Sequence, residues 1–236
     1  MQLLEAGMGL RSAVIELRRQ GGSLRFVLFP MVHLGEPSFY EAVMERLRGC
    51  DLVVAEGIRG RSRAASALTL SYRLVKRGRL GLVAQKLDLE SLAIPVLLPD
   101  MTGGEFDLGW RGVPLRQRLL IWCVLPVYVP MVFLFGNRAR LAGHLSLEDD
   151  HGMGGSHREG FEEMLKVLRD DRDRLLIDAL AAIHETHGAE PLRVGVVYGA
   201  QHMISVVHVL SARFGYVARA GDWLTVFDYE QRHEGR

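Results

Sequence analysis

The stretch LRFVLFPMVHLGEPSFYEAVMERLRGCDLVVAE, residues 24–56, decides the fold of this chain. It opens with the apolar run Leu24–Val32 and closes with the run Leu52–Ala55. A short, continuous apolar run of this kind is typical of a strand covered on both faces. Between the two runs, Pro37 begins a segment whose apolar residues recur at helical spacing as far as Leu47. The order strand, helix, strand predicts a sheet that contains parallel strands.

The same pattern extends outward in both directions. Upstream, Val14–Arg19 and the turn pair Gly21-Gly22 predict a β-hairpin with the first strand. Downstream, the pattern predicts helix over Arg61–Gly78, a short strand at Ile94–Leu98, a long helix over Arg158–His187, a buried strand at Arg193–Tyr198, a helix from about His202 to Phe214 and a last strand at Trp223–Phe227. We therefore expect one α/β domain over residues 1–236. Its core would be a central mixed, largely parallel sheet with helices on both faces, with an apolar helical insertion near 115–140.

Composition narrows the function classes. The chain has 236 residues, with 29 Lys plus Arg against 28 Asp plus Glu, so no charge excess favours a nucleic-acid partner. Its two cysteines, Cys50 and Cys123, make no disulfide framework, and their apolar surroundings predict buried free thiols. The first thirty residues do not resemble a signal peptide. We expect a cytoplasmic protein, associated with a membrane if the apolar segment near 119–137 contacts one.

Polar residues follow three of the predicted strands. His33 comes after the first strand, Glu56 after the second, and His202 shortly after the strand Arg193–Tyr198. In open α/β sheets, ligands bind at the carboxyl ends of the strands, so these side chains are expected to converge. Two imidazoles and a carboxylate suit a divalent ion such as Zn²⁺, Mn²⁺ or Co²⁺, and they equally suit metal-free acid–base chemistry. The alternative is that each histidine is a hydrogen-bonded structural residue.

Two further features bear on the site. Arg172 falls on the apolar stripe of the long predicted helix, and a buried guanidinium needs a carboxylate or a bound anion. The alternative is that it reaches a helix edge and pairs with a surface aspartate. Asp173 is adjacent but points about 100° away around the helix. The segment Asp149–His157 resembles a metal site in composition, but its glycines favour a flap over a site rather than a fixed ligand set.

Several motifs occur in the order found in a known family. His33-Leu-Gly-Glu-Pro-Ser38, with the later strand ending in Glu56, and Tyr198-Gly-Ala-Gln-His202, followed by a helix and Phe214-Gly-Tyr216, resemble the two histidine motifs of the TraB/PrgY/GumN family. Gln85, Asp100, Glu105-Phe106 and the pair Arg172-Asp173 resemble further family positions. The resemblance covers about residues 13–229. The wider clan includes the TIKI metalloproteases, the erythromycin esterases and the haem-binding ChaN proteins.

The resemblance implies a metal-dependent hydrolase that acts on a peptide or another amide or ester bond. The metal ligands would be His33, Glu56 and His202. The catalytic residues would be Glu36, Glu56, Arg172 and Asp173, and Ser38, Gln85, Asp100, Gly199 and Gln201 would line the site. The alternatives are a non-catalytic protein that binds a peptide or small molecule, as PrgY-type relatives suggest, and a haem-binding protein with His33 or a flap histidine as axial ligand.

One residue departs from the family pattern. Where the family has glycine three residues before its first histidine, this chain has Pro30. Proline fixes φ and removes an N–H, so the end of that strand is expected to be shaped differently.

The segment Leu119–Asn137 has nineteen residues and no charge. It is long enough to cross a bilayer, but Pro126 and Pro130 interrupt its helical hydrogen bonds, and a single crossing would separate His33 from His202. We therefore expect a kinked apolar hairpin or helix pair beside the site. It would be buried in a homodimer interface or rest on a membrane surface.

Overall fold

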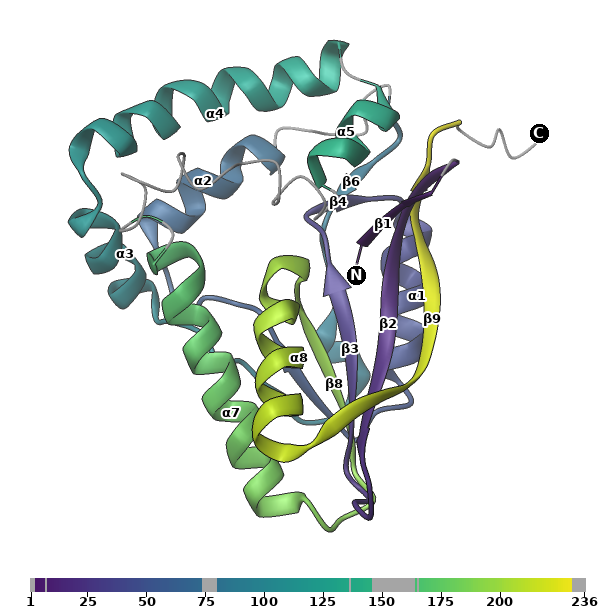
Figure 1. Ribbon diagram of the computed structural model, residues 1–236. Coiled ribbons are helices and arrows are strands. Elements are labelled where there is room, and N and C mark those ends of the chain that lie inside the picture. The colour runs from purple at the N-terminus through teal and green to yellow at the C-terminus, as the bar shows by residue number, and fades with distance from the viewer. Residues whose placement is uncertain are drawn as a thin grey trace.

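A seven-stranded sheet forms the centre of the molecule in the computed structural model, which describes residues 3–6, 8–73, 80–135, 137–145, 164 and 166–230 (Figure 1). Four neighbouring strands run parallel, in the order β3 (Arg25–Met31), β8 (Arg193–Gly199), β5 (Leu52–Ala55) and β7 (Val96–Leu97). The antiparallel strands are β1 (Leu3–Ala6), β2 (Gly9–Arg19) and β9 (Tyr216–Asp228). The predicted mixed, largely parallel sheet is confirmed.

The predicted hairpin joins the two parts of the sheet. Strands β2 and β3 pair antiparallel from Ile15 opposite Leu28 to Arg18 opposite Arg25. Gly21 has a φ of 72° in the turn, a conformation that glycine adopts without a steric penalty. Pro30 lies beyond the last β2–β3 pair, where the Ser12 hydroxyl donates a 2.7 Å hydrogen bond to its carbonyl. A proline therefore fits here without removing a donor from the β2–β3 ladder.

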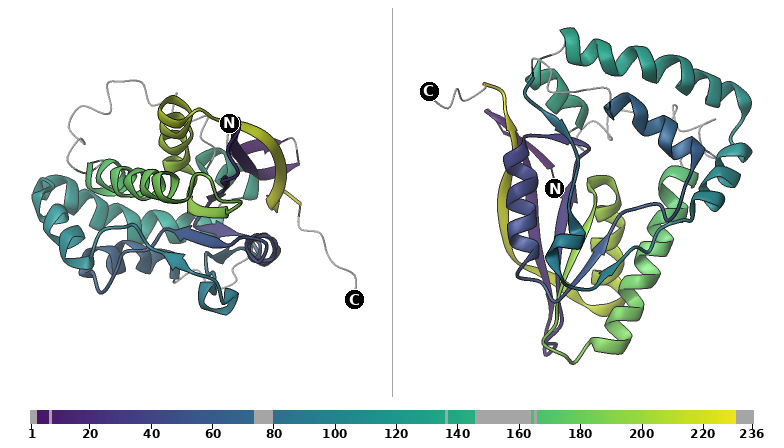
Figure 2. Two further views of the ribbon diagram at one scale, coloured as in Figure 1. Left: turned by 90° about the horizontal axis from the view of Figure 1, so that it is seen from below. Right: turned by 180° about the vertical axis from the view of Figure 1, so that it is seen from behind.

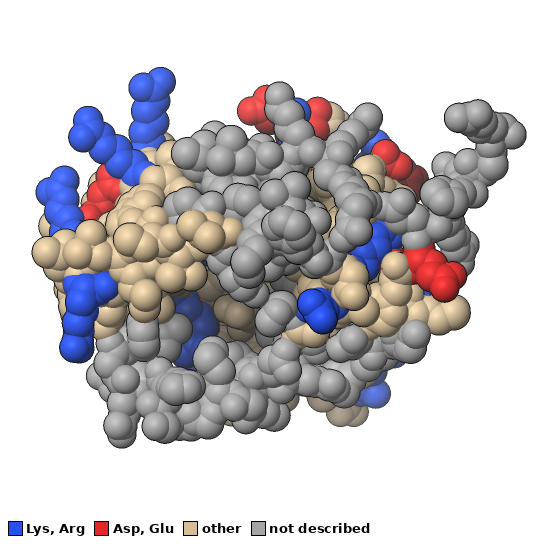
Figure 3. All heavy atoms as spheres, turned by 90° about the horizontal axis from the view of Figure 1, so that it is seen from above, with Lys and Arg blue, Asp and Glu red and all other residues tan. Residues whose placement is uncertain are grey.

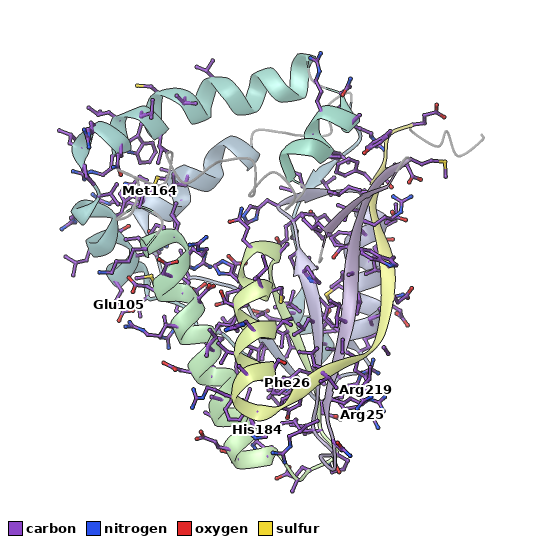
Figure 4. The ribbon with its side chains drawn as sticks, in the orientation of Figure 1. Arg25, Phe26, Glu105, Met164, His184 and Arg219 are labelled. Carbon is purple, nitrogen blue, oxygen red and sulfur yellow. The ribbon has the colours of Figure 1, made fainter. Side chains whose placement is uncertain are left out.

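Helices cover both faces of the sheet. Side chains alternate along β3, so Val27 and Phe29 pack toward α1 (Pro37–Leu47), whereas Phe26 and Leu28 pack toward α7 (Asp171–His187) and α8 (Ala200–Phe214). Phe26 is labelled in Figure 4, and its ring contacts that of Tyr216 at 5.1 Å between centroids. Figure 2 shows α7 and α8 together on one side of the sheet and α1 on the other. The predicted layers are confirmed.

A third apolar cluster lies beyond the carboxyl ends of the parallel strands, apart from the two clusters on the sheet faces. Its largest buried members are Phe106 and Trp110 of α3 (Gly103–Gly112), with Met101 and Val167. Helix α3 begins with a capping box, in which the side chains of Thr102 and Glu105 each accept from the other's backbone N–H (Glu105 is labelled in Figure 4). The other elements are β4 (Leu34–Gly35), α2 (Arg63–Arg73), β6 (Val83–Ala84), a 3₁₀ turn (Leu89–Leu92), α3 (Gly103–Gly112), α4 (Leu115–Phe135), α5 (Arg138–Leu145) and a π-helical turn (Lys166–Asp170).

The apolar insertion differs from its predicted form. The prediction of a kinked hairpin or helix pair within Leu119–Asn137 is wrong, because α4 continues as one helix through both prolines. Pro126 and Pro130 are four residues apart, so the carbonyl groups that lose their donors lie on one face and the rest of the ladder is retained. Among the residues that the structure describes in full, no helix is long and apolar enough to cross a membrane.

Other boundaries also differ from the prediction. Strand β9 begins at Tyr216 rather than Trp223, because it pairs with β2 along its whole length although most of the added residues are exposed. Strand β1 was not predicted. Cys50 is buried as expected, but Cys123 is exposed on α4. The first part of the predicted helix Arg158–His187 lies outside the described residues.

Candidate active site at the carboxyl ends of the parallel strands

A cavity with a volume of about 650 Å³ opens at the carboxyl ends of the parallel strands. Strand β8 lies between β3 and β5, and the chain leaves β3 for α1 on one face but leaves β8 for α8 on the other. Such a reversal leaves a crevice between the diverging connections. Polar residues of the cavity wall include His33, Glu56, Gln85 and Arg172. The sheet topology therefore brings together the segments in which the sequence predicted a site.

A network of buried charges forms the floor of this site. Arg172 of α7 donates from Nε and Nη2 to the two carboxylate oxygens of Asp100, at 2.9 and 2.6 Å. Its Nη2 also donates to Glu56 Oε1 at 2.6 Å. Asp100 is fully buried, and it accepts further hydrogen bonds from the backbone N–H groups of Met101 and Gly57. The expected partner of the buried guanidinium is thus a pair of carboxylates.

The environment keeps both carboxylates ionised. Burial on its own would raise the pKa of Glu56, but Arg172, His202, the Gly199 N–H and His33 together hold it below its ordinary value. Burial likewise opposes ionisation of Asp100, and hydrogen bonds and charge from Arg172 outweigh it and lower that pKa. Glu56 is therefore a fixed negative charge at neutral pH and not a proton donor.

His202 is held by a third carboxylate of the site, that of Asp173 on α7. The Asp173 side chain bonds His202 Nδ1 at 2.5 Å and accepts a 2.6 Å hydrogen bond from the hydroxyl of Ser205. His202 and Asp173 are both buried. With a proton on Nδ1, the ring presents Nε2 as a lone pair, which is the form that binds a metal or removes a proton from water. Asp173 thus orients His202, and both residues lie behind the cavity wall rather than among the residues that line it.

Gly199 lies between Glu56 and His202. Its N–H donates to Glu56 Oε2 at 2.7 Å. A Cβ atom at this position would lie 3.2 Å from Glu56 Oε2, 3.4 Å from His202 Cδ2 and 4.0 Å from His202 Nε2. The carboxylate and the imidazole therefore approach the same glycine, and a side chain there would press against both. His33 is exposed, lines the cavity and lies close enough to Glu56 to lower its pKa.

Carboxylates outnumber arginine in the site. Glu56, Asp100 and Asp173, counted as ionised, carry three negative charges against one positive charge on Arg172, a difference of two that positive charge on His202 and His33 would offset. Buried charge is costly unless it is compensated, so a protonated imidazole or a bound cation would stabilise this arrangement. His33, Glu56 and His202 therefore suit a divalent ion in donor type and in charge. In the described part of the chain, however, no group of three or more His, Cys, Asp or Glu is already arranged to hold one.

Three predicted site residues lie elsewhere. Glu36 forms an ion pair with Arg138 of α5 at 2.6 Å, and Arg138 also donates to the carbonyl groups of Leu80 and Asp228. Ser38 lies at the start of α1 and lines a different cavity, and Gln201 is exposed on the first turn of α8. The structure does bring Gln85 to the site, where its N–H donates to the His33 carbonyl at 2.8 Å. Glu36 therefore joins α1 to α5 instead of facing Glu56.

Two contributions to the site were missed. Ser205 follows His202 by three residues on α8, so the helical period already places both on one face. The apolar wall of the cavity was not predicted, because its residues come from irregular segments and from α2, α3 and the π-helical turn. The predicted flap Asp149–His157 lies outside the described residues.

The fold and site define a mixed α/β domain with a polar crevice at a switch point of its parallel strands. Comparison with known protein families, with curated proteins and with solved structures yielded no match to this chain. The resemblance to the TraB/PrgY/GumN family stays a prediction.

Proposed function

We propose that this protein is a hydrolase that cleaves an amide or ester bond, with a divalent cation held by His33, Glu56 and His202. The observation that supports it most is the pairing of an ionised Glu56 with a His202 ring that Asp173 orients. Metal-ligating histidines characteristically bond a carboxylate through their other ring nitrogen, and Asp173 supplies that bond. The cation, when bound, would polarise the scissile carbonyl and lower the pKa of a water molecule.

Each residue of the site has a separate part in this proposal. Arg172 fixes Glu56 through Oε1, and the Gly199 N–H fixes it through Oε2, so the carboxylate cannot rotate away. Asp173 holds the His202 ring so that Nε2 carries the lone pair that would bind the cation. Only in the metal-free alternative would the same lone pair accept a proton from water. Arg172 is already engaged by two carboxylates, so its part is to position Glu56 and not to bind developing negative charge directly.

The cavity supports a substrate with an apolar side chain. Apolar residues form much of its wall, namely Ile58, Leu68, Leu87, Leu89, Phe106 and Leu168. Its volume of about 650 Å³ lies within the range of small-molecule binding sites. The same wall also favours the second candidate function, a non-catalytic protein that binds a peptide or small molecule. Turnover distinguishes the two, because a binding protein retains its ligand unchanged.

The test combines metal content with hydrolysis. Purified protein is analysed for bound transition metals and assayed against a panel of fluorogenic peptides and aryl esters, with and without a chelator. His202→Ala should lower both metal occupancy and turnover, because affinity depends on every ligand. His208→Ala is the matched control, since His208 is exposed and lies about 1.7 turns further along the same helix. Visible absorption of the same sample tests the haem alternative.

The outcomes separate the parts of the proposal. Turnover that the chelator does not affect, in protein free of metal, would leave the acid–base pair His202–Asp173 as the catalyst and overturn the cation. Tight binding of peptides without turnover on any substrate would favour the binding protein. An effect of His208→Ala equal to that of His202→Ala would contradict the assignment of the site.

A further inference from the structure

Helix α4 exposes an apolar surface that nothing in the described structure covers. Leu115, Leu119 and Trp122 follow at intervals of four and three residues, and they are 62, 52 and 37% exposed. Leu120, Val124 and Val127 repeat this spacing and are 50, 47 and 65% exposed. At about 100° per residue these two stripes take up more than half of the helix circumference. We call these six residues the α4 surface.

The inner side of α4 is already packed. Gln117 is buried, Ile121 packs against the cluster that contains Phe106, and the Trp122 ring contacts that of Trp110 edge to face at 6.4 Å. Trp122 therefore lies at the edge of the α4 surface, in contact with Trp110 and still 37% exposed. In its described part the helix packs against the protein on one side and exposes apolar side chains on the other, where a helix normally carries polar residues. An exposed apolar patch of this extent indicates an interaction surface.

The segment that carries this surface is basic, although Asp107 lies near Arg111 and Glu36 pairs with Arg138. Residues 108–147 contain five arginines, Arg111, Arg116, Arg118, Arg138 and Arg140, and no Asp or Glu. Arg111, Arg116 and Arg140 are exposed, and Arg116 lies between the two apolar stripes. Figure 3 looks down on this end of the molecule and shows Lys and Arg side chains projecting around a tan surface at the side where α4 begins, with some Asp or Glu atoms between them. Apolar residues fringed by arginine match the chemistry of an anionic membrane surface.

The path of the chain sets the orientation of α4. At one end it follows α3, and at the other it leads into α5, whose Arg138 is tied by hydrogen bonds to Leu80, Glu36 and Asp228. Both ends are therefore anchored to the same body, and the helix extends along one side of it (Figure 1). We propose that the α4 surface lies in the interface of a membrane that contains anionic lipids. The helix rests parallel to that membrane, with Trp122 at headgroup depth.

Charge also argues against a second copy of this chain as the occupant. In a symmetric dimer built on α4, the arginine-bearing ends of the two helices would face each other in either direction. Glu36 already pairs with Arg138 and Asp107 lies near Arg111, but no acidic residue between 108 and 147 is available to neutralise Arg116 and Arg140. Anionic headgroups supply that charge, so the membrane satisfies both the apolar and the basic parts of the surface.

The experiment is flotation of the full chain with vesicles of phosphatidylcholine alone and of phosphatidylcholine mixed with phosphatidylserine. The test variant is Leu120→Gln/Val124→Gln/Val127→Gln. The control is Met8→Gln/Ile204→Gln/Val217→Gln, which changes three exposed apolar residues on other elements. All six positions are exposed, so both variants should fold, which circular dichroism and thermal unfolding check. A third variant, Arg111→Gln/Arg116→Gln, tests the basic fringe.

We expect the protein to float with the mixed vesicles and much less with phosphatidylcholine alone. The α4 variant should bind at least about tenfold more weakly, since it loses three apolar side chains. Each arginine removed should weaken binding to the mixed vesicles about fivefold. Added salt should also weaken this binding, because it screens the charges. The control variant should bind like the wild-type protein.

Three results would overturn the proposal. They are failure of the wild-type protein to float with either vesicle, equal flotation of the α4 variant and the wild-type protein, and equal binding to both vesicle types. Light scattering provides a further test. If the wild-type protein is a dimer and the α4 variant is a monomer, a second copy of the chain covers this surface.

Discussion

Replacing Arg172 with leucine should strongly destabilise the protein. The side chain of Arg172 is 11% exposed, and it is the cation that two buried carboxylates share, with Glu56 16% and Asp100 0% exposed. The substitution removes three hydrogen bonds between charged groups, each contributing about 1.5–3 kcal/mol in isolation. Such contributions are not additive, and removing one partner of a buried pair typically costs about 3–5 kcal/mol. For a chain of this size that corresponds to a Tm lower by roughly 6–20 °C.

The pH dependence of stability should also change sign. In the wild-type protein the pKa values of Glu56 and Asp100 are lowered, so their contribution is present above about pH 4 and is lost as the pH falls through the lowered values. Without Arg172, burial dominates and raises both pKa values. A raised carboxyl pKa gives stability that is lost as the pH rises through it. The variant should therefore gain stability relative to the wild-type protein as the pH falls from 7 to 5, because the wild-type carboxylates stay ionised over this range.

Urea unfolding monitored by circular dichroism at pH 7 and pH 5 measures both the loss of stability and its pH dependence. Arg174→Leu is the matched control, because Arg174 lies on the same helix and its side chain is 71% exposed. It should alter stability by less than about 0.5 kcal/mol. A loss below about 1 kcal/mol for Arg172→Leu, or an unchanged pH dependence, would refute the argument that Arg172 compensates buried charge.

Two further predictions concern the residues that hold the site and the helix α5. Asp173→Asn should weaken metal binding or lower kcat by about 10–100-fold, because His202 loses the carboxylate that orients it, while urea unfolding changes little. Metal titration and steady-state kinetics measure these losses. A large drop in the free energy of unfolding that accompanies the loss of activity would indicate a structural role for Asp173 instead. Arg138→Met should lower the free energy of unfolding by about 3 kcal/mol, because Glu36 loses its buried partner. Arg140→Met is the exposed control, and a similar small effect of both substitutions on Tm would contradict the assignment.

Much of the fold follows from local pattern. Continuous apolar runs predicted β3, β5 and β8, and the segment from Pro37 predicted α1, because buried strands and amphipathic helices impose different periods on the sequence. Strand β9 was predicted only at its apolar end. Its first part is held by backbone hydrogen bonds to β2, which leave its exposed side chains unconstrained. Helix α4 was misjudged because proline weakens a helix locally but does not end it where the helix is supported at both ends.

By itself, the sequence determined that His33, Glu56 and His202 each follow the end of a strand, and that Arg172 lies on a buried stripe that requires a counter-charge. These are properties of one residue and its neighbours along the chain. Only the tertiary structure decided that Arg172 takes both Glu56 and Asp100 as partners, that Asp173 turns back to His202, and that Glu36 bonds Arg138 instead of facing the cavity. The physical reason is distance along the chain. The Glu36–Arg138 bond joins residues 102 apart and the Arg172–Glu56 bond joins residues 116 apart. No local period relates such residues, and the order of the strands together with the packing of the helices on them determines which of them meet.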